Sequence, residues 1–70
     1  MSPKKRQEIG AMVKRLREAR DMTQLELATK AGVPQGYISE LEAGKKKNPG
    51  LDVLLKLAQA LQVKPARLLE

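Results

Sequence analysis

Apolar side chains recur every three or four positions along most of this chain, which is the spacing of one face of an α-helix. The first such stretch contains Ile9, Met12, Val13 and Leu16, and it predicts a helix over about residues 2–20. No segment alternates apolar and polar residues between turn signals, as a half-buried strand does. The pattern therefore predicts an all-α fold.

The strongest signals for a helix start and a helix end lie in the middle of the chain. Thr23 and Glu26 have capping-box spacing, in which the threonine oxygen accepts from the backbone N–H of Glu26 and the carboxylate accepts from the N–H of Thr23. Gly32 suits the left-handed backbone with which many helices end. These signals predict a short helix over residues 24–31.

A second short helix is predicted directly after that glycine. Pro34 has a preset φ and no N–H that needs a partner, so it opens this helix without a capping hydroxyl. Ile38 and Leu41 form its buried face, and the helix runs over about residues 35–43. Two short helices joined by a tight turn form a helix-turn-helix, whose second helix lies in the major groove of DNA.

The rest of the chain predicts two further helical segments. Residues 44–50 are too rich in turn formers to sustain a helix. Leucines at helical spacing then predict a helix over residues 51–61, and Pro65 opens a last short one. We therefore predict five helices in a single domain over residues 1–70, with residues 1–6 as a basic arm.

Seven positions of the central segment match one known family: Gln24, Leu27, Ala28, Gly32, Val33, Ile38 and Leu41. Through them the chain resembles the phage-repressor and Cro-type helix-turn-helix DNA-binding family, and the resemblance extends over nearly its whole length. In that family the motif would run from Gln24 to Ala43. The resemblance implies a compact five-helix, lambda-repressor-like domain in which the second and third helices form the motif.

The charge of the chain agrees with a nucleic-acid partner. Fourteen Lys and Arg against eight Asp and Glu give a net charge of +6 and an isoelectric point near 10.0. Excess positive charge favours a polyanion, because each neutralised phosphate releases condensed counterions. The alternative is a lysine-rich surface that only keeps the domain in solution.

The resemblance assigns base reading to the exposed face of the helix over residues 35–43. Gln35 takes the first base-reading position, where a glutamine amide matches the major-groove edge of adenine. Glu40 accepts from a cytosine amino group, and Tyr37 contacts a thymine methyl group or a phosphate. Gly36 and Ser39 complete the face, and glycine departs from the side chain usual in the family. The alternative for Gln35 and Glu40 is a solvated helix face.

Phosphate contacts are expected at two places. Gln24 resembles the phosphate clamp of the family, and the N-terminus of its helix adds partial positive charge. The loop after the second motif helix contributes Lys45, Lys46, Lys47 and Asn48, where the family grips the DNA backbone. A run of lysines is, alternatively, an ordinary solvated loop.

One charged pair is predicted to be structural. The resemblance implies a largely buried ion pair between Arg17 and Glu42, which would fix the first helix against the recognition helix. Breaking one side of such a pair is strongly destabilising, whereas an apolar replacement of both partners is often neutral.

The composition argues against catalysis. The chain contains no His and no Cys, and no glycine-rich loop suited to a nucleotide, so we expect neither an enzyme nor a metal or cofactor. It has no apolar run near the roughly 18 residues that span a bilayer, and no signal-peptide pattern. We expect a cytoplasmic, nucleoid-associated protein.

The resulting function hypothesis is a sequence-specific regulator of transcription that binds double-stranded DNA as a homodimeric repressor on a palindromic operator. The alternative is an antitoxin or adaptor whose main role is to bind a partner protein, with autoregulatory DNA binding. A controller of restriction genes would share the DNA mechanism. The C-terminal apolar residues either form the dimer surface or complete the core; they are Val63, Pro65, Ala66, Leu68 and Leu69.

Overall fold

The computed structural model describes residues 8–46 and 48–70, and every element in these residues is helical. The elements are α1 (Glu8–Ala19), α2 (Gln24–Ala31), α3 (Gln35–Glu42), α4 (Leu51–Leu61) and the 3₁₀ helix η1 (Pro65–Leu69). The prediction of an all-α fold is thus confirmed. The expected beginning of the first helix, near residue 2, lies outside the described residues, and so does the basic arm.

The prediction of five α-helices is wrong, because the last segment is a 3₁₀ helix. The N–H of Arg67 donates to the carbonyl of Lys64 at 2.9 Å, and the N–H of Glu70 donates to the carbonyl of Arg67 at 3.4 Å. Both bonds span three residues rather than four. Proline at the start of η1 leaves few donors, and a segment this short commonly adopts 3₁₀ geometry.

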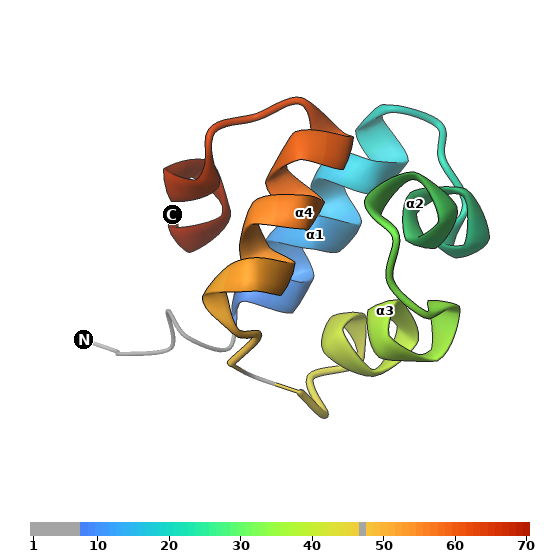
Figure 1. Ribbon diagram of the computed structural model, residues 1–70, viewed down its shortest axis with the longest axis horizontal. Coiled ribbons are helices and arrows are strands. Elements are labelled where there is room, and N and C mark those ends of the chain that lie inside the picture. The colour runs from blue at the N-terminus through green and yellow to red at the C-terminus, as the bar shows by residue number, and fades with distance from the viewer. Residues whose placement is uncertain (1–7, 47) are drawn as a thin grey trace.

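The four α-helices enclose one aliphatic core (Figure 1). α1 and α4 cross in the middle of the molecule, α2 and α3 lie together on one side of them, and η1 lies on the other side. α1 packs against α3, α4 and η1, while α2 packs against α3 and α4. The largest side chains at the centre of this core have almost no exposed surface: Val13, Leu27, Ile38, Leu41, Leu57, Leu61 and Leu68.

α2 begins and ends through the predicted signals. The N–H of Glu26 donates to the Thr23 hydroxyl at 3.0 Å, and the N–H of Thr23 donates to the Glu26 carboxylate at 2.7 Å, which completes the capping box. Gly32 ends the helix with φ +76°, and its N–H donates to the carbonyl of Ala28. The predicted bounds of α2 are confirmed.

α3 and α4 also follow the prediction closely, with two differences. α3 ends at Glu42, one residue earlier than expected, because Gly44 turns the chain with φ +83°. α4 has the predicted bounds but ends on Gln62 with φ +60°, a left-handed backbone that is uncommon for a residue with a Cβ atom. The N–H of Val63 donates to the carbonyl of Ala58 at 3.0 Å, which satisfies this helix end.

α1 approaches the end of α3 very closely at a glycine. A Cβ atom on Gly10 would overlap the carbonyl oxygen of Leu41 and lie 3.3 Å from the Cα of Glu42. Only a residue without a side chain permits this approach of the two backbones. Gly10 therefore sets how near α1 lies to the recognition helix.

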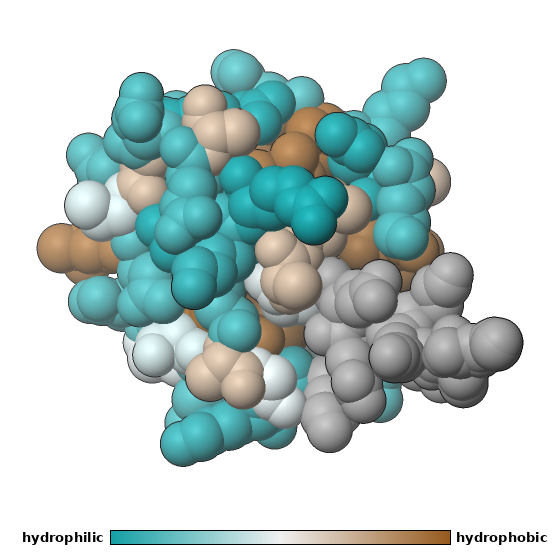
Figure 2. Space-filling view, turned by 180° about the vertical axis from the view of Figure 1, so that it is seen from behind, coloured by the Kyte–Doolittle hydropathy of each residue, from teal (hydrophilic) through white to brown (hydrophobic). Residues whose placement is uncertain are grey.

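The outer surface is largely hydrophilic on the side seen in Figure 2, where hydrophobic side chains show only in small, separate areas. Single exposed apolar side chains are normal on proteins of this size. Among the described helices none is both long and apolar enough to span a bilayer.

Candidate nucleic-acid interface

The five predicted base-reading residues all lie on α3, and the packing of that helix decides which of them face solvent. Ile38 and Leu41 are fully buried, which turns the opposite side of α3 outward. Gln35, Gly36, Ser39 and Glu40 are exposed, whereas Tyr37 is half-buried and packs partly on the core. The outer face of α3 thus carries an amide, a hydroxyl and a carboxylate on a helix that packs against both α1 and α2.

The ion pair expected between Arg17 and Glu42 is present and nearly enclosed. Arg17 Nε lies 2.8 Å from Glu42 Oε2, and Nη2 lies 2.9 Å from Oε1, so the contact is bidentate. The two side chains are only 10% and 4% exposed. The remaining guanidinium nitrogen, Nη1, donates to the carbonyl of Met22 at 2.7 Å. One guanidinium therefore joins α1, the α1–α2 turn and α3.

The environment of Arg17 keeps its charge fixed. Its hydrogen bond with Glu42 raises the pKa of Arg17 above the ordinary value. Burial of the guanidinium lowers this pKa by a smaller amount, and the negative charges of Glu42 and Glu18 raise it further. A raised pKa keeps Arg17 protonated at every pH below the ordinary arginine pKa, so its contribution to stability is fully present throughout the neutral range. The pair is therefore not a pH switch in the neutral range.

Gln24 makes a contact that sequence reasoning missed. It is the first residue of α2, and its amide Nε2 donates to Glu42 Oε1 at 3.0 Å. The side chain expected to clamp a phosphate is thus held by the buried carboxylate at the end of α3. Gln24 and Glu42 lie on different helices, 18 residues apart in the sequence, and such a pair leaves no periodic pattern. Only the tertiary structure therefore reveals this bond.

The loop after α3 returns toward the helix it has just left. The N–H groups of Lys45 and Lys46 donate to the carbonyl of Glu40 at 2.8 and 3.3 Å. Lys45, Lys46 and Asn48 are exposed, and Lys47 lies outside the described residues. The Lys46 ammonium lies 3.6 Å from Glu40 Oε1 and 5.2 Å from the centre of the Tyr37 ring. The structure therefore joins a predicted phosphate-binding residue to two predicted base-reading residues.

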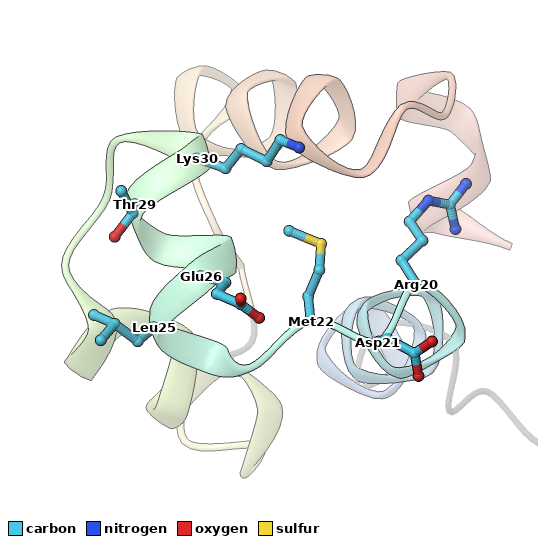
Figure 3. A pocket seen from close by; sticks show the side chains of 7 residues that line it. All are labelled: Arg20, Asp21, Met22, Leu25, Glu26, Thr29 and Lys30. Carbon is cyan, nitrogen blue, oxygen red and sulfur yellow. The ribbon is translucent and has the colours of Figure 1, made fainter.

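A cavity of about 560 Å³ lies beside α2, away from the residues just described. Figure 3 shows Met22 in the space between α1 and α2, with Arg20 and Lys30 at its edges. Glu26, which also lines the cavity, belongs to the capping box of α2, and an Arg20 N–H donates to the carbonyl of Leu16 at 3.4 Å. Glu26 and Arg20 at this cavity thus each bond to the backbone at a helix end.

The C-terminal apolar residues divide between the two roles that the sequence left open. Leu68 is 1% exposed and belongs to the core, and Val63 packs partly against it. Leu69 is 54% exposed, and Pro65 and Ala66 are also exposed. The segment therefore completes the core with one face and leaves the other face available.

Comparison with known proteins assigns the family. The helix-turn-helix family profile matches residues 13–68. The chain belongs to the helix-turn-helix family. Its resemblance to the phage-repressor and Cro-type branch is confirmed by relatives that are regulators of transcription.

Two relatives illustrate the match in sequence. The helix-turn-helix-type transcriptional regulator y4dJ of Sinorhizobium fredii is 42% identical over 55 residues, which cover 79% of this chain and 70% of that protein. The helix-turn-helix-type transcriptional regulator SinR of Bacillus subtilis is 36% identical over 62 residues, or 89% of this chain. The matched part spans 56% of the length of SinR.

Solved structures agree with the fold. The restriction-modification controller protein C.AhdI from Aeromonas hydrophila superposes with a TM-score of 0.83 at 34% identity, covering 87% of this chain and 91% of its own. SinR, described as the master regulator for biofilm formation and solved in complex with DNA, superposes with a TM-score of 0.86 at 35% identity. That match covers 89% of this chain and 98% of the SinR chain. These two helix-turn-helix proteins therefore share the fold of this chain over most of its length.

Proposed function

We propose that this protein is a sequence-specific regulator of transcription that binds double-stranded DNA with α3 in the major groove. The proposal rests mainly on the outer face of α3, where Gln35, Ser39 and Glu40 are exposed. The opposite face of the helix is buried in the core. A major groove about 12 Å wide admits such a helix, and its base edges offer the donors and acceptors that these side chains match. The DNA complex of the similar protein SinR supports the proposal.

Each group on the interface has a distinct role in this proposal. Gln35, in the first turn of α3, donates to and accepts from an adenine edge. Lys45 and the second N–H of the Gln24 amide, the first of which donates to Glu42, hold the phosphate backbone, with the N-terminus of α2 adding partial positive charge at Gln24. The absence of a side chain at Gly36 lets the backbone of α3 approach the bases closely.

We further propose that the protein acts in the cytoplasm, on the nucleoid, as a homodimeric repressor of a palindromic operator. A two-fold dimer would place its recognition helices in successive major grooves, about 34 Å apart. The exposed side of the C-terminal segment, with Leu69 at its end, is available for the contact between the protomers. The net charge of +6 on each chain favours binding of both protomers to one polyanion.

The decisive experiment is selection of bound duplexes from a random DNA pool at about 0.15 M salt, where the Debye length of about 8 Å weakens nonspecific contacts. We expect enrichment of a palindrome whose half-sites lie about ten base pairs apart. Gln35→Ala should then relax the preference at one position of each half-site. Gln59→Ala, which removes an exposed glutamine from α4, is the matched control and should leave the selected site unchanged.

A folded protein that enriches no sequence would contradict base reading by α3. Circular dichroism and a thermal melt of the same preparation establish that the protein is folded. Under that result the exposed face of α3 would have another occupant, and purification with partner proteins would be the next step.

A further inference from the structure

The loop that follows α3 is attached to the recognition helix rather than extended away from it. Gly44 has φ +83°, a conformation that glycine adopts without strain, and it reverses the direction of the chain. The next two N–H groups, those of Lys45 and Lys46, both donate to the carbonyl of Glu40. A direct hydrogen bond to Glu40 therefore ties the backbone of Lys46 to α3.

The side chain of Lys46 is fixed to the same helix by two further contacts. Its ammonium lies 3.6 Å from Glu40 Oε1 and 5.2 Å from the centre of the Tyr37 ring, over the face that attracts cations. Lys46 and Glu40 remain 43% and 52% exposed, so both charged groups are open to a ligand. An ammonium and a carboxylate thus stand side by side on the outer face of α3.

We propose that Lys46 and Glu40 together read one G·C base pair, so that Lys46 determines sequence specificity instead of only holding a phosphate. This inference rests on the proposed function. The Lys46 ammonium donates to guanine O6 and N7, and the Glu40 carboxylate accepts from the amino group N4 of cytosine. The pair acts as one donor-and-acceptor unit toward the major-groove edge.

The spacing of the two groups fits this edge. Guanine O6 and cytosine N4 are held together by their own hydrogen bond, at about 2.9 Å. The 3.6 Å between the ammonium and the carboxylate places a donor and an acceptor at a similar separation. In an A·T pair thymine O4 and adenine N6 offer the same polarity, but a methyl group lies beside O4 where guanine has the second acceptor N7. The ammonium therefore makes more hydrogen bonds to G·C.

The charges also explain how Glu40 enters the groove. A lone carboxylate between two phosphate backbones is repelled, and the groove provides little to offset that repulsion. Lys46 neutralises this carboxylate before DNA is bound, because the pair exists in the free protein. The Tyr37 ring keeps the ammonium on the helix, and so it limits escape of Lys46 to a phosphate.

The test compares Lys46→Ala with Lys56→Ala on the operator selected by the unmodified protein. Lys56 is a close match for Lys46, since its ammonium lies 3.5 Å from Asp52 on α4 and its side chain is 46% exposed. Both variants lose one positive charge and one exposed ion pair. Affinities are measured for the operator and for duplexes in which each G·C pair is replaced in turn.

We expect Lys46→Ala to lose about tenfold or more of the preference for G·C at one position of each half-site, with other positions unaffected. Lys56→Ala should retain that preference. Replacing this guanine by 7-deazaguanine, which lacks N7, should weaken binding of the unmodified protein but not of Lys46→Ala. Inosine lacks only the minor-groove amino group and is the control base, so it should bind normally.

Three results would overturn the inference while leaving the proposed function intact. They are a selected half-site without a required G·C pair, unchanged specificity of Lys46→Ala, and a loss of affinity by Lys46→Ala that is equal on all sequences. The last would show a phosphate contact, with a shallower salt dependence as its signature. Failure of the unmodified protein to select any sequence would instead overturn the proposed function, and this inference with it.

Discussion

At the scale of single residues, the carboxylate of Glu42 is the centre of a nearly enclosed hydrogen-bond network. It accepts from the guanidinium of Arg17 twice and from the amide of Gln24 once, and its side chain is only 4% exposed. A charge removed from water is tolerated when partners satisfy it. Within the described residues every buried side-chain N or O atom has a hydrogen-bond partner. This network therefore depends on each of its members.

Glu42→Ala should lower the free energy of unfolding by about 3–5 kcal/mol, because it leaves Arg17 charged and buried without its main partner. Glu18→Ala is the matched control, since Glu18 is 58% exposed and 4.0 Å from the same guanidinium. It should cost no more than about 0.5 kcal/mol. Urea unfolding of both variants, of the single variants Arg17→Met and Glu42→Met, and of the Arg17→Met, Glu42→Met double variant provides the measurement.

The double variant tests whether Arg17 and Glu42 are energetically coupled. If the network acts as a unit, the loss in the double variant is clearly smaller than the sum of the two single losses. Additive losses would contradict coupling between Arg17 and Glu42.

Some residue-scale features were available from the sequence and others were not. The Arg17–Glu42 pair followed from resemblance, because both residues occupy recognisable family positions. The bond from Gln24 to Glu42 and the attachment of Lys46 to α3 were not predictable. Each depends on where two segments meet in space, and neither leaves a periodic pattern or a capping signal in the sequence.

At the scale of elements, the position of α3 depends on how closely α1 approaches it. Gly10 allows backbone contact near Leu41, and the ion pair from Arg17 lies two turns further along α1. α1 thus holds the C-terminal end of the recognition helix at two points. The outward face of α3 is set by this support as much as by its own residues.

Gly10→Ala should destabilise the protein by about 1–3 kcal/mol, although alanine is the better helix former, because the added methyl group overlaps the backbone of α3. Gly36→Ala is the matched control. Gly36 is a helical glycine with no atom within 4 Å of its ideal Cβ position, so alanine there should stabilise by up to about 1 kcal/mol. Thermal melts followed by circular dichroism compare the two variants, and equal melting temperatures would contradict the close approach.

Helix ends show which parts of the elements a sequence can specify. α2 was predicted to the residue because Thr23, Glu26 and Gly32 give local signals that the backbone obeys. α4 ends on Gln62 in a left-handed conformation, and no glycine at this position signals the end in the sequence. The end of α4 was therefore predicted from the leucine pattern alone. η1 has the expected position but 3₁₀ geometry, a distinction that a few residues of apolar spacing do not encode.

At the scale of the whole molecule, the excess of positive charge predicts a steep dependence of DNA binding on salt. If each protomer makes about four phosphate contacts, a dimer should show a slope of about −7 in a plot of log affinity against log salt concentration. Lys45→Ala should make this slope shallower by about one for each lysine removed. Fluorescence anisotropy of a labelled operator at several salt concentrations gives the slope.

Lys56→Ala serves again as the control for loss of charge alone, since its partner Asp52 lies on α4. It should leave the slope nearly unchanged. A slope shallower than about −3 for the unmodified protein would contradict docking in the groove with phosphates on both sides.

The aliphatic core has a practical consequence for watching this interface. The chain contains one tyrosine and neither tryptophan nor phenylalanine, so Tyr37 is its sole source of intrinsic fluorescence. That ring lies on α3 beneath the Lys46 ammonium. Any ligand that stacks on the ring, shifts the ammonium or excludes water from the hydroxyl changes the only emission the protein has. The recognition helix therefore carries a native optical reporter, and occupancy of its outer face can be followed without a label on the protein.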